Sequence, residues 1–183
     1  MRVIPNELLE GPLLLEPTVH RDGRGFFTET FRASALEQLG VTDAWVQDNH
    51  SRSDRGVVRG MHFHIGDGVA KLVRCGRGAI WDVLVDLRRD SPTYGRWEGF
   101  DLDDETQRLL YVPRGFAHGF CVGSEIADVL YKQSAYYDPA VERGIAYDDP
   151  DVAIAWPIEL ELTPSPRDAS APRLAEIAGE LSF

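Results

Sequence analysis

The stretch GVVRGMHFHIGDGVAKLVRCGRGAIWDVLVDLR, residues 56–88, carries most of the information about this chain. It places His62 and His64 two residues apart in an apolar run. Residues at this spacing in a β-strand point to the same face of the sheet. Lys71 begins a second apolar run, and lysine is rarely buried without a partner. We therefore expect His62 and Lys71 to face a ligand, and we give a structural and a functional role of His64 equal weight.

A third histidine, His118, follows a Pro-Arg-Gly turn in YVPRGFAHGF (111–120). With the glycines around them, the histidines and Lys71 have a spacing similar to that of the two half-motifs of the cupin fold. Metal-binding cupins hold a divalent ion with imidazoles and a carboxylate. Lys71 stands where such a site has its carboxylate, and an ammonium group repels a cation. The sequence therefore predicts acid–base chemistry on an organic anion, with no metal.

Short β-type runs separated by Gly, Pro and Asp favour an all-β sandwich or barrel. Clear examples are 72–87, 108–113 and 127–137. A chain of 183 residues fits one domain with a substantial core. We therefore expect a single cupin jelly roll over 1–183, with a few short helices.

The few helical signals lie mainly near the C-terminus. SALEQLG (34–40) predicts a short helix that starts behind a serine cap and ends at a glycine. APRLAEIAGEL (171–181) has apolar residues at helical spacing and Pro172 near its first turn. TPSPRDASAP (163–172) predicts a loop, so we expect 163–183 to form a loop followed by a helix.

Composition and charge limit the partners of the chain. The net charge of −11 argues against non-specific binding of nucleic acid or anionic membranes, although local cations can still hold a small anion. Cys75 and Cys121 stand in apolar runs without Cys-x-x-Cys spacing, so we expect buried free thiols. The N-terminus lacks a signal pattern and no apolar run approaches about 18 residues, so we expect a cytoplasmic protein.

Three further motifs have an ordinary structural interpretation when each is taken alone. HRDGRGFFTETF (20–31) predicts a hairpin with a tight Asp-Gly turn, a solvated arginine and a core phenylalanine. VQDNHS (46–51) predicts a polar strand end, and we expect His20 and His50 at the surface or in turns. Tyrosines at strand spacing in 130–144 predict half-buried packing groups.

Nine blocks of the chain, taken in order, resemble the dTDP-4-dehydrorhamnose 3,5-epimerase family from about residue 10 to 175. They are RDGRGFFTETF, VQDNHS, GVVRGMHFH, AKLVRC, GAIWDVLVDLRRDSPTYGRW, YVPRGFAHGF, ADVLYKQSAYYDPAVERGI, DDPDVAIAWP and SPRDASAPRL. The resemblance implies a cupin jelly roll that acts on a nucleotide sugar without a cofactor. It also implies a homodimer in which an N-terminal segment is exchanged and helps to complete the partner's site.

The resemblance implies roles for individual residues. His62 in RGMH matches the catalytic base, Asp168 in SPRD the carboxylate that orients it, and Tyr131 in VLYK the general acid. The positions implied to bind substrate are Arg24, Glu29, Gln47, Asp48, Asn49, Arg59, Lys71, His118, Glu142 and Arg167, with Phe27 and Tyr137 as platforms for the thymine base.

The residue types also suit this chemistry by themselves. A 4-keto sugar has acidic C–H bonds at C3 and C5, and inversion needs a base on one face and a proton donor on the other. Free histidine titrates near 6.5, which suits His62 as the base, and a bond to Asp168 would fix its tautomer. Lys71, with Arg59, would meet the negative charge that develops at O4. Proton transfer of this kind requires no redox cofactor, and the chain has no Gly-rich fingerprint for binding a dinucleotide.

The chain departs from the family pattern in three places. His64 replaces a glutamine, the loop before Lys71 is shorter, and Arg167 stands at a lysine position. His64 favours an alternative, a metal-dependent cupin that uses His62, His64 and His118. A non-catalytic sugar-nucleotide-binding protein is a second alternative, and inversion at C3 alone, at C5 alone or on another nucleotide stays open.

Overall fold

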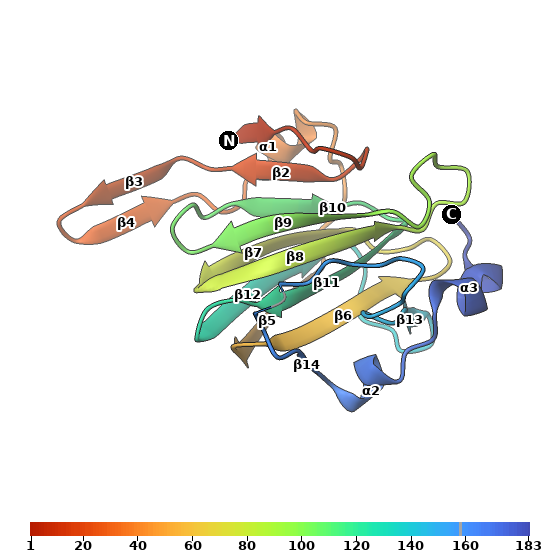
Figure 1. The fold of residues 1–183 in the computed structure, drawn as a ribbon. Coiled ribbons are helices and arrows are strands. Elements are labelled where there is room, and N and C mark those ends of the chain that lie inside the picture. The colour runs from red at the N-terminus through yellow and green to blue at the C-terminus, as the bar shows by residue number, and fades with distance from the viewer. Residues whose placement is uncertain (158) are drawn as a thin grey trace.

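Two β-sheets lie face to face in the computed structural model, which describes residues 1–157 and 159–183 (Figure 1). The first, called the β5 sheet, runs in the order β1 (Arg2–Ile4), β2 (Leu13–Glu16), β10 (Leu109–Val112), β7 (Lys71–Arg77), β12 (Ile126–Gln133) and β5 (Gln47–Asp54). The second, called the β6 sheet, runs β13 (Glu142–Gly144), β6 (Val57–His64), β11 (Phe116–Val122), β8 (Ala79–Asp86) and β9 (Trp97–Asp103). The predicted all-β jelly roll is confirmed.

The main core fills the space between the two sheets. Because strand residues alternate between faces, most of the inner-strand residues that point into this layer are apolar. Its buried members include Val73, Leu84, Phe100, Leu102, Leu110, Phe116, Phe120 and Val129. Cys75 is in the same core and Cys121 is buried on the other side of the β6 sheet, so the predicted free thiols are confirmed.

The outer face of each sheet is covered by a different part of the chain. Helix α1 (Ala33–Glu37) places Leu36 on the β5 sheet against Leu72 and Leu109. The C-terminal region covers the β6 sheet with Trp156, Leu174, Ile177 and Leu181, which pack on Met61, Phe63, Val83 and Val85. The β6 sheet is therefore buried on both faces over much of its area.

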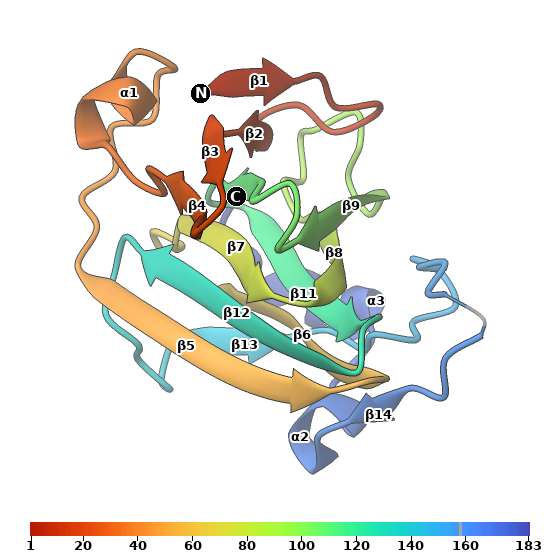
Figure 2. The same ribbon diagram turned by 90° about the vertical axis from the view of Figure 1, so that its left-hand side faces the viewer.

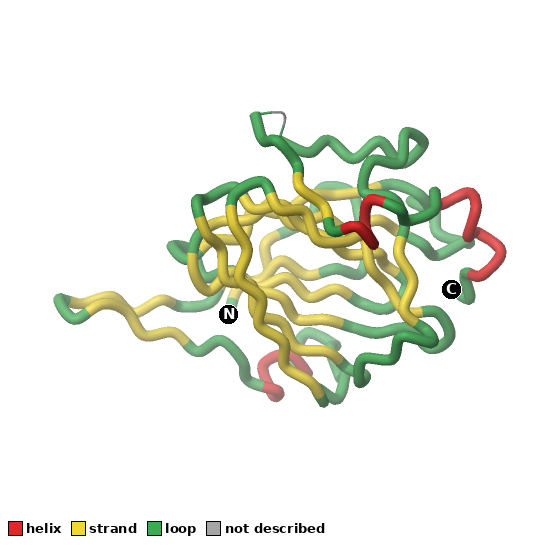
Figure 3. Tube along the Cα trace, turned by 90° about the horizontal axis from the view of Figure 1, so that it is seen from below, coloured by secondary structure: helices red, strands yellow, loops and turns green. Residues whose placement is uncertain are grey.

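Strands β3 (Val19–Asp22) and β4 (Gly25–Thr28) form a separate hairpin, the arm, which projects beyond the sandwich (Figures 1 and 3). The arm was predicted to carry a core phenylalanine, and this prediction was wrong. Phe26 is 50% exposed and Phe27 is 71% exposed, because neither sheet reaches the hairpin. Exposing two adjacent phenylalanines to water is unfavourable for a single chain, and exposed apolar patches commonly mark a contact with another molecule.

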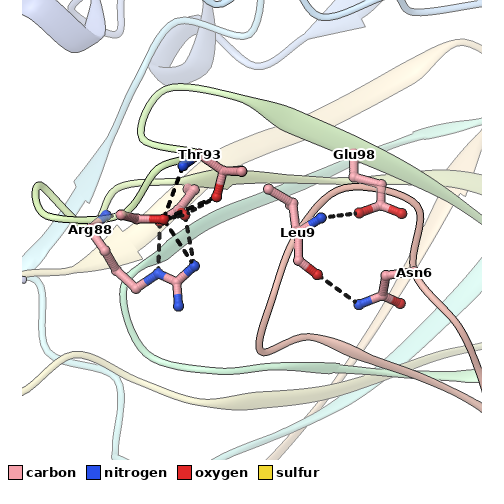
Figure 4. Close-up of polar contacts among 7 residues, drawn as sticks. Asn6, Leu9, Arg88, Thr93 and Glu98 are labelled. Carbon is pink, nitrogen blue, oxygen red and sulfur yellow. Dashed lines mark hydrogen bonds and ion pairs between the residues drawn. The ribbon is translucent and has the colours of Figure 1, made fainter.

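Residues 1–16, which precede the arm, are held firmly on the sandwich (Figure 4). The buried carboxylate of Glu98 accepts the backbone N–H groups of Glu7 and Leu9 at 2.7 Å each. Asn6 donates its side-chain amide to the carbonyl of Leu9 at 3.2 Å. The start of the chain is therefore fixed, and the arm is the part of the N-terminal region that is free to contact another molecule.

Three local predictions need correction. Helix α1 begins at Ala33, so Ser34 lies inside it and the N-cap is Arg32, without a side-chain capping bond. The predicted loop 163–172 contains strand β14 (Thr163–Pro164), parallel to β6, and helix α2 (Pro166–Ala169). The predicted terminal helix is short, because α3 (Leu174–Ile177) passes into a 3₁₀ turn, η1 (Ala178–Glu180).

No helix in the described part of the chain is long and apolar enough to cross a membrane.

Candidate active site

A cavity of about 500 Å³ opens between the two sheets, along the first half of β5 and most of β6. Its lining residues come from β5, β7 and β12 on one side, from β6 and β11 on the other, and from the segment that contains β14 and α2. Figure 2 shows how these elements are arranged. Eleven of the predicted site residues line it: Gln47, Asn49, Arg59, His62, Lys71, His118, Tyr131, Tyr137, Glu142, Arg167 and Asp168. Polar groups from most of the length of the chain therefore converge on one space.

His62 and Asp168 form a hydrogen-bonded pair in this cavity. Nε2 of His62 lies 2.7 Å from Oδ1 of Asp168. Ser165 caps α2 by accepting the N–H of Asp168 at 3.1 Å, which fixes the position of the carboxylate. Burial is the largest single influence on Asp168 and opposes its ionisation, but the bond and charge of His62, together with hydrogen bonds from Ser165 and the backbone of Gly60, hold the pKa of Asp168 below its usual value. The carboxylate is therefore ionised at neutral pH and accepts a hydrogen bond from Nε2–H of His62, which leaves Nδ1 of His62 free.

A bulge in β6 brings Arg59 to the same face as His62. Arg59 pairs with Phe120, and His62 pairs with His118, so three steps along β6 match two along β11. The position of the extra residue is set by Gly60, which has a φ of 124°. A Cβ there would lie 2.5 Å from the Cα of Gly119, so only glycine fits. Simple alternation along β6 would put Arg59, three residues before His62, on the opposite face, so the bulge is what brings it into the cavity.

Lys71 and His118 are both buried beside His62. Nζ of Lys71 lies 3.5 Å from Nδ1 of His118 and donates to the carbonyl oxygen of His62 at 3.4 Å. The other ring nitrogen of His118, Nε2, lies 2.9 Å from Asp82. Burial lowers the pKa of Lys71 to about 8, and Glu142 and Asp82 act against this. Burial also lowers the pKa of His118, so this ring is neutral at neutral pH.

Tyr131 enters the cavity from the wall opposite His62. It lies in β12, paired with Asn49 of β5, whereas His62 lies in β6 of the facing sheet. Burial raises the pKa of Tyr131, and the negative charge of Glu142 raises it further. The hydroxyl is therefore protonated at neutral pH and can act as a donor.

The mouth of the cavity is polar. Nη1 of Arg167 lies 2.6 Å from a carboxylate oxygen of Glu142, which stands on β13. Gln47 accepts the backbone N–H of Tyr137 at 2.8 Å and donates to the side chain of Asn49 at 3.0 Å. Tyr137 was expected in a strand, but β12 ends at Gln133 and the ring is half exposed at the entrance.

Four predicted residues lie elsewhere in this chain. Asp48 points to the other side of β5 and forms an ion pair with Lys132 at 2.9 Å. Arg24 and Phe27 lie on the arm, and Glu29 follows it and pairs with Arg32. None of the four lines the cavity.

Sequence reasoning missed several residues of the site. Ser51, Phe120, Gln133, Thr163, Pro164 and Ser165 line the cavity, and Asp82 lies behind it. Ser51 continues the every-second-residue pattern of Gln47 and Asn49, and Asp82 is a charge in an apolar strand, so both had a signal. The contribution of 163–165 depends on the pairing of β14 with β6, for which the sequence gives no local sign.

His64 is buried behind this wall and is absent from the cavity lining. It faces Glu142 across the β6–β13 pairing, and its Nε2 has no hydrogen-bond partner among the residues that the structure describes. Over the same residues, no group of three or more His, Cys, Asp and Glu side chains is placed to hold a metal ion.

Comparison with known proteins identifies the family. A family model described as dTDP-4-dehydrorhamnose 3,5-epimerase matches residues 6–176. The dTDP-4-dehydrorhamnose 3,5-epimerase of Escherichia coli K12 is 48% identical over 170 residues, 92% of this chain and 91% of that protein. The dTDP-4-dehydrorhamnose 3-epimerase of Streptomyces niveus is 46% identical over 170 residues, 92% of this chain and 82% of that protein. The crystal structure of dTDP-6-deoxy-D-glucose-3,5-epimerase from Legionella pneumophila, in complex with dTDP-4-keto-L-rhamnose, is 44% identical with a TM-score of 0.94, covering 98% of this chain and 96% of that one. This chain therefore belongs to the dTDP-4-dehydrorhamnose 3,5-epimerase family of isomerases.

Proposed function

We propose that the chain inverts both C3 and C5 of dTDP-4-dehydro-6-deoxy-D-glucose to give dTDP-4-dehydro-L-rhamnose. The observation that carries the proposal is the approach of His62 and Tyr131 to one cavity from opposite walls. Inversion requires this arrangement, because the proton leaves one face of the sugar ring and a proton returns to the other.

His62 acts as the base through Nδ1, since Nε2 is bonded to Asp168. It takes the proton from the carbon next to the C4 carbonyl. The C–H electron pair forms a double bond to C4, and the carbonyl π electrons move onto O4, which gives the enolate. The negative charge of Asp168 stabilises the imidazolium that results. Tyr131 then gives its hydroxyl proton to the opposite face of the same carbon, and the enolate returns to the ketone.

Lys71 and Arg59 support the enolate oxygen. Both line the cavity, and the ammonium of Lys71 is held on one side by His62 and His118. Such a donor, aimed at a negative charge that develops as the proton leaves, is worth about 3–4 kcal/mol in enzymes that stabilise oxyanions. Glu142 and Arg167 at the mouth bind the rest of the substrate, and Tyr137 stacks on the thymine base.

The arm completes the cavity of a second copy in a homodimer. The support for this is the exposure of Phe27, at 71%, and of the side chain of Arg24, at 91%. Because residues 1–16 are fixed on their own sandwich, the exchanged part is the arm, with Arg24, Phe27 and Glu29.

Complementation tests this directly: an Arg24→Ala/Phe27→Ala chain is mixed with a His62→Ala chain under conditions that exchange subunits.

In such a mixed dimer, one cavity has an intact base and receives an intact arm, so we expect activity to return. If each arm served its own cavity, no mixed dimer would hold a complete site and the mixture would stay inactive. Each chain alone provides the control.

Inversion at C3 alone is the second candidate, and the Streptomyces niveus relative, a 3-epimerase at 46% identity, favours it. Incubation with dTDP-4-dehydro-6-deoxy-D-glucose in D2O distinguishes the two by NMR. Deuterium at C3 and C5, with the coupling constants of an L-rhamno product, supports the proposal. Deuterium at C3 alone supports the 3-epimerase, and tight dTDP binding without any exchange would identify a non-catalytic binding protein.

A further inference from the structure

Asp82 is a buried carboxylate for which the mechanism above has no direct use. It lies in β8, between Ile80 and Leu84 of the main core, and is completely buried. Oδ2 lies 2.9 Å from Nε2 of His118, and Oδ1 has no partner among the residues that the structure describes. Burying a charge here is unfavourable unless hydrogen bonds or an opposite charge compensate for its lost hydration. The bond to His118 is the one that the described residues give to this carboxylate, so the role of Asp82 depends on what this bond does.

The bond to Asp82 selects one tautomer of His118. An ionised carboxylate can only accept, so Nε2 of His118 carries the proton. The other ring nitrogen, Nδ1, then has a free lone pair, and this atom lies 3.5 Å from Nζ of Lys71. An ammonium group can only donate, so this tautomer is the one that attracts Lys71. The three side chains form a continuous line from the core to the cavity.

Lys71 depends on such support because its surroundings oppose its charge. The side chain is 7% exposed, and its second contact is the carbonyl oxygen of His62 at 3.4 Å. Burial lowers the pKa of Lys71 to about 8, close to neutral pH, and the charges of Glu142 and Asp82 act in the other direction. Of these two carboxylates, Glu142 is already paired with Arg167.

We infer that Asp82 is a positioning residue for the reaction, which acts through His118 to keep the ammonium of Lys71 protonated and aimed at the enolate oxygen. The inference rests on the proposed function of Lys71. Asp82 itself contacts His118 and is absent from the cavity lining.

The titration of Lys71 tests the inference without a catalytic assay. The chain has two lysines, Lys71 and Lys132, so protein grown with ¹³C-lysine gives two ε-carbon signals that are followed by NMR against pH. Asp82→Asn removes the charge and keeps the shape. Asp86→Asn is the matched control, because Asp86 is equally buried in the same strand but is bonded to Arg88, Ser91 and Thr93 and not to His118.

In Asp82→Asn we expect the Lys71 signal to titrate at lower pH than in the wild type, with Lys132 unchanged. Asp86→Asn should leave both signals in place. Because the protonated lysine is the active form, the alkaline limb of the kcat profile should move to lower pH in Asp82→Asn by the same amount as the NMR midpoint. At neutral pH, turnover should fall at least several-fold and dTDP should bind as before. An unchanged Lys71 midpoint and an unchanged alkaline limb in a folded Asp82→Asn protein would overturn the inference.

A measurement on the wild type covers the case in which Asp82→Asn does not fold. Long-range ¹H–¹⁵N spectra report which ring nitrogen of each histidine carries the proton. We expect His118 as the neutral Nε2–H form at pH 7, and the Nδ1–H form or the imidazolium would overturn the inference. Wild-type protein that exchanges no substrate protons in D2O would refute the proposed function. The tautomer of His118 and the titration of Lys71 would still show whether Asp82 acts through His118 on Lys71.

Discussion

Replacing Lys71 by methionine should stabilise the fold and destroy the activity. The pKa of this lysine falls from 10.5 to about 8 on folding because the ammonium is buried. At pH 7 the lysine is charged in both states, and the gap between these pKa values corresponds to a destabilisation on the order of 3 kcal/mol. Methionine has a similar length and no charge to desolvate, so Lys71→Met should raise the free energy of unfolding at pH 7 by up to about this amount.

The pH dependence of the free energy of unfolding gives an independent test of the sign of this effect. Between pH 8 and 10.5 the unfolded chain still binds the lysine proton and the folded chain has released it. The wild type should therefore gain stability across this window, and the advantage of Lys71→Met should shrink and vanish above it. Urea unfolding at pH 7, 9 and 11 measures this, with turnover expected to fall by about 10²–10³. Lys132→Met, which removes a surface ion pair with Asp48, is the control, with an expected change below about 1 kcal/mol. Equal destabilisation of Lys71→Met at every pH would refute the reasoning.

Asp168→Asn removes a charge-assisted bond of 2.7 Å to His62, which is worth about 1.5–3 kcal/mol, so exchange at C3 and C5 should slow roughly 10- to 100-fold. Asp149→Asn, a buried carboxylate that caps Leu174 instead, should leave the rate unchanged. Tyr131→Phe should still incorporate deuterium from D2O while net inversion falls, and equal loss of both would indicate a positioning role. Arg167→Ala, which leaves Glu142 unpaired at the mouth, should raise KM more than it lowers kcat in steady-state assays. Exhaustive EDTA treatment should leave activity intact, and activity lost to EDTA and restored by one metal would contradict the mechanism.

Local patterns in the sequence were sufficient for the parts of the fold that depend on alternation. The run 72–87 was predicted to be β-type, and it forms most of two strands, β7 and β8, on either side of Gly78. Val73, Cys75, Ile80 and Leu84 from this run belong to the core between the sheets. His62 and Lys71 were expected to face a ligand, and both line the cavity. These features follow from the period of a strand, which a single sequence displays.

The errors have physical causes that alternation does not include. The bulge at Gly60 reverses the facing of Arg59, and it becomes visible only when β11 is paired with β6. The segment with β14 and α2 carries Asp168, but its sequence resembles a loop because its order comes from long-range pairing with β6. The arm was predicted to bury a phenylalanine, since the sequence does not show that its hairpin extends beyond both sheets.

The central claim is that one base, His62, removes the protons from both C3 and C5. The most direct measurement is the rate of deuterium incorporation at each carbon by His62→Ala in D2O, compared with the wild type and with His50→Ala, whose ring lies exposed on β5 beside Asp128. We predict that both rates fall in parallel by about 10²–10⁴ in His62→Ala, with dTDP binding retained, and that His50→Ala exchanges normally. Exchange at either carbon that persists at near the wild-type rate in His62→Ala would contradict the claim.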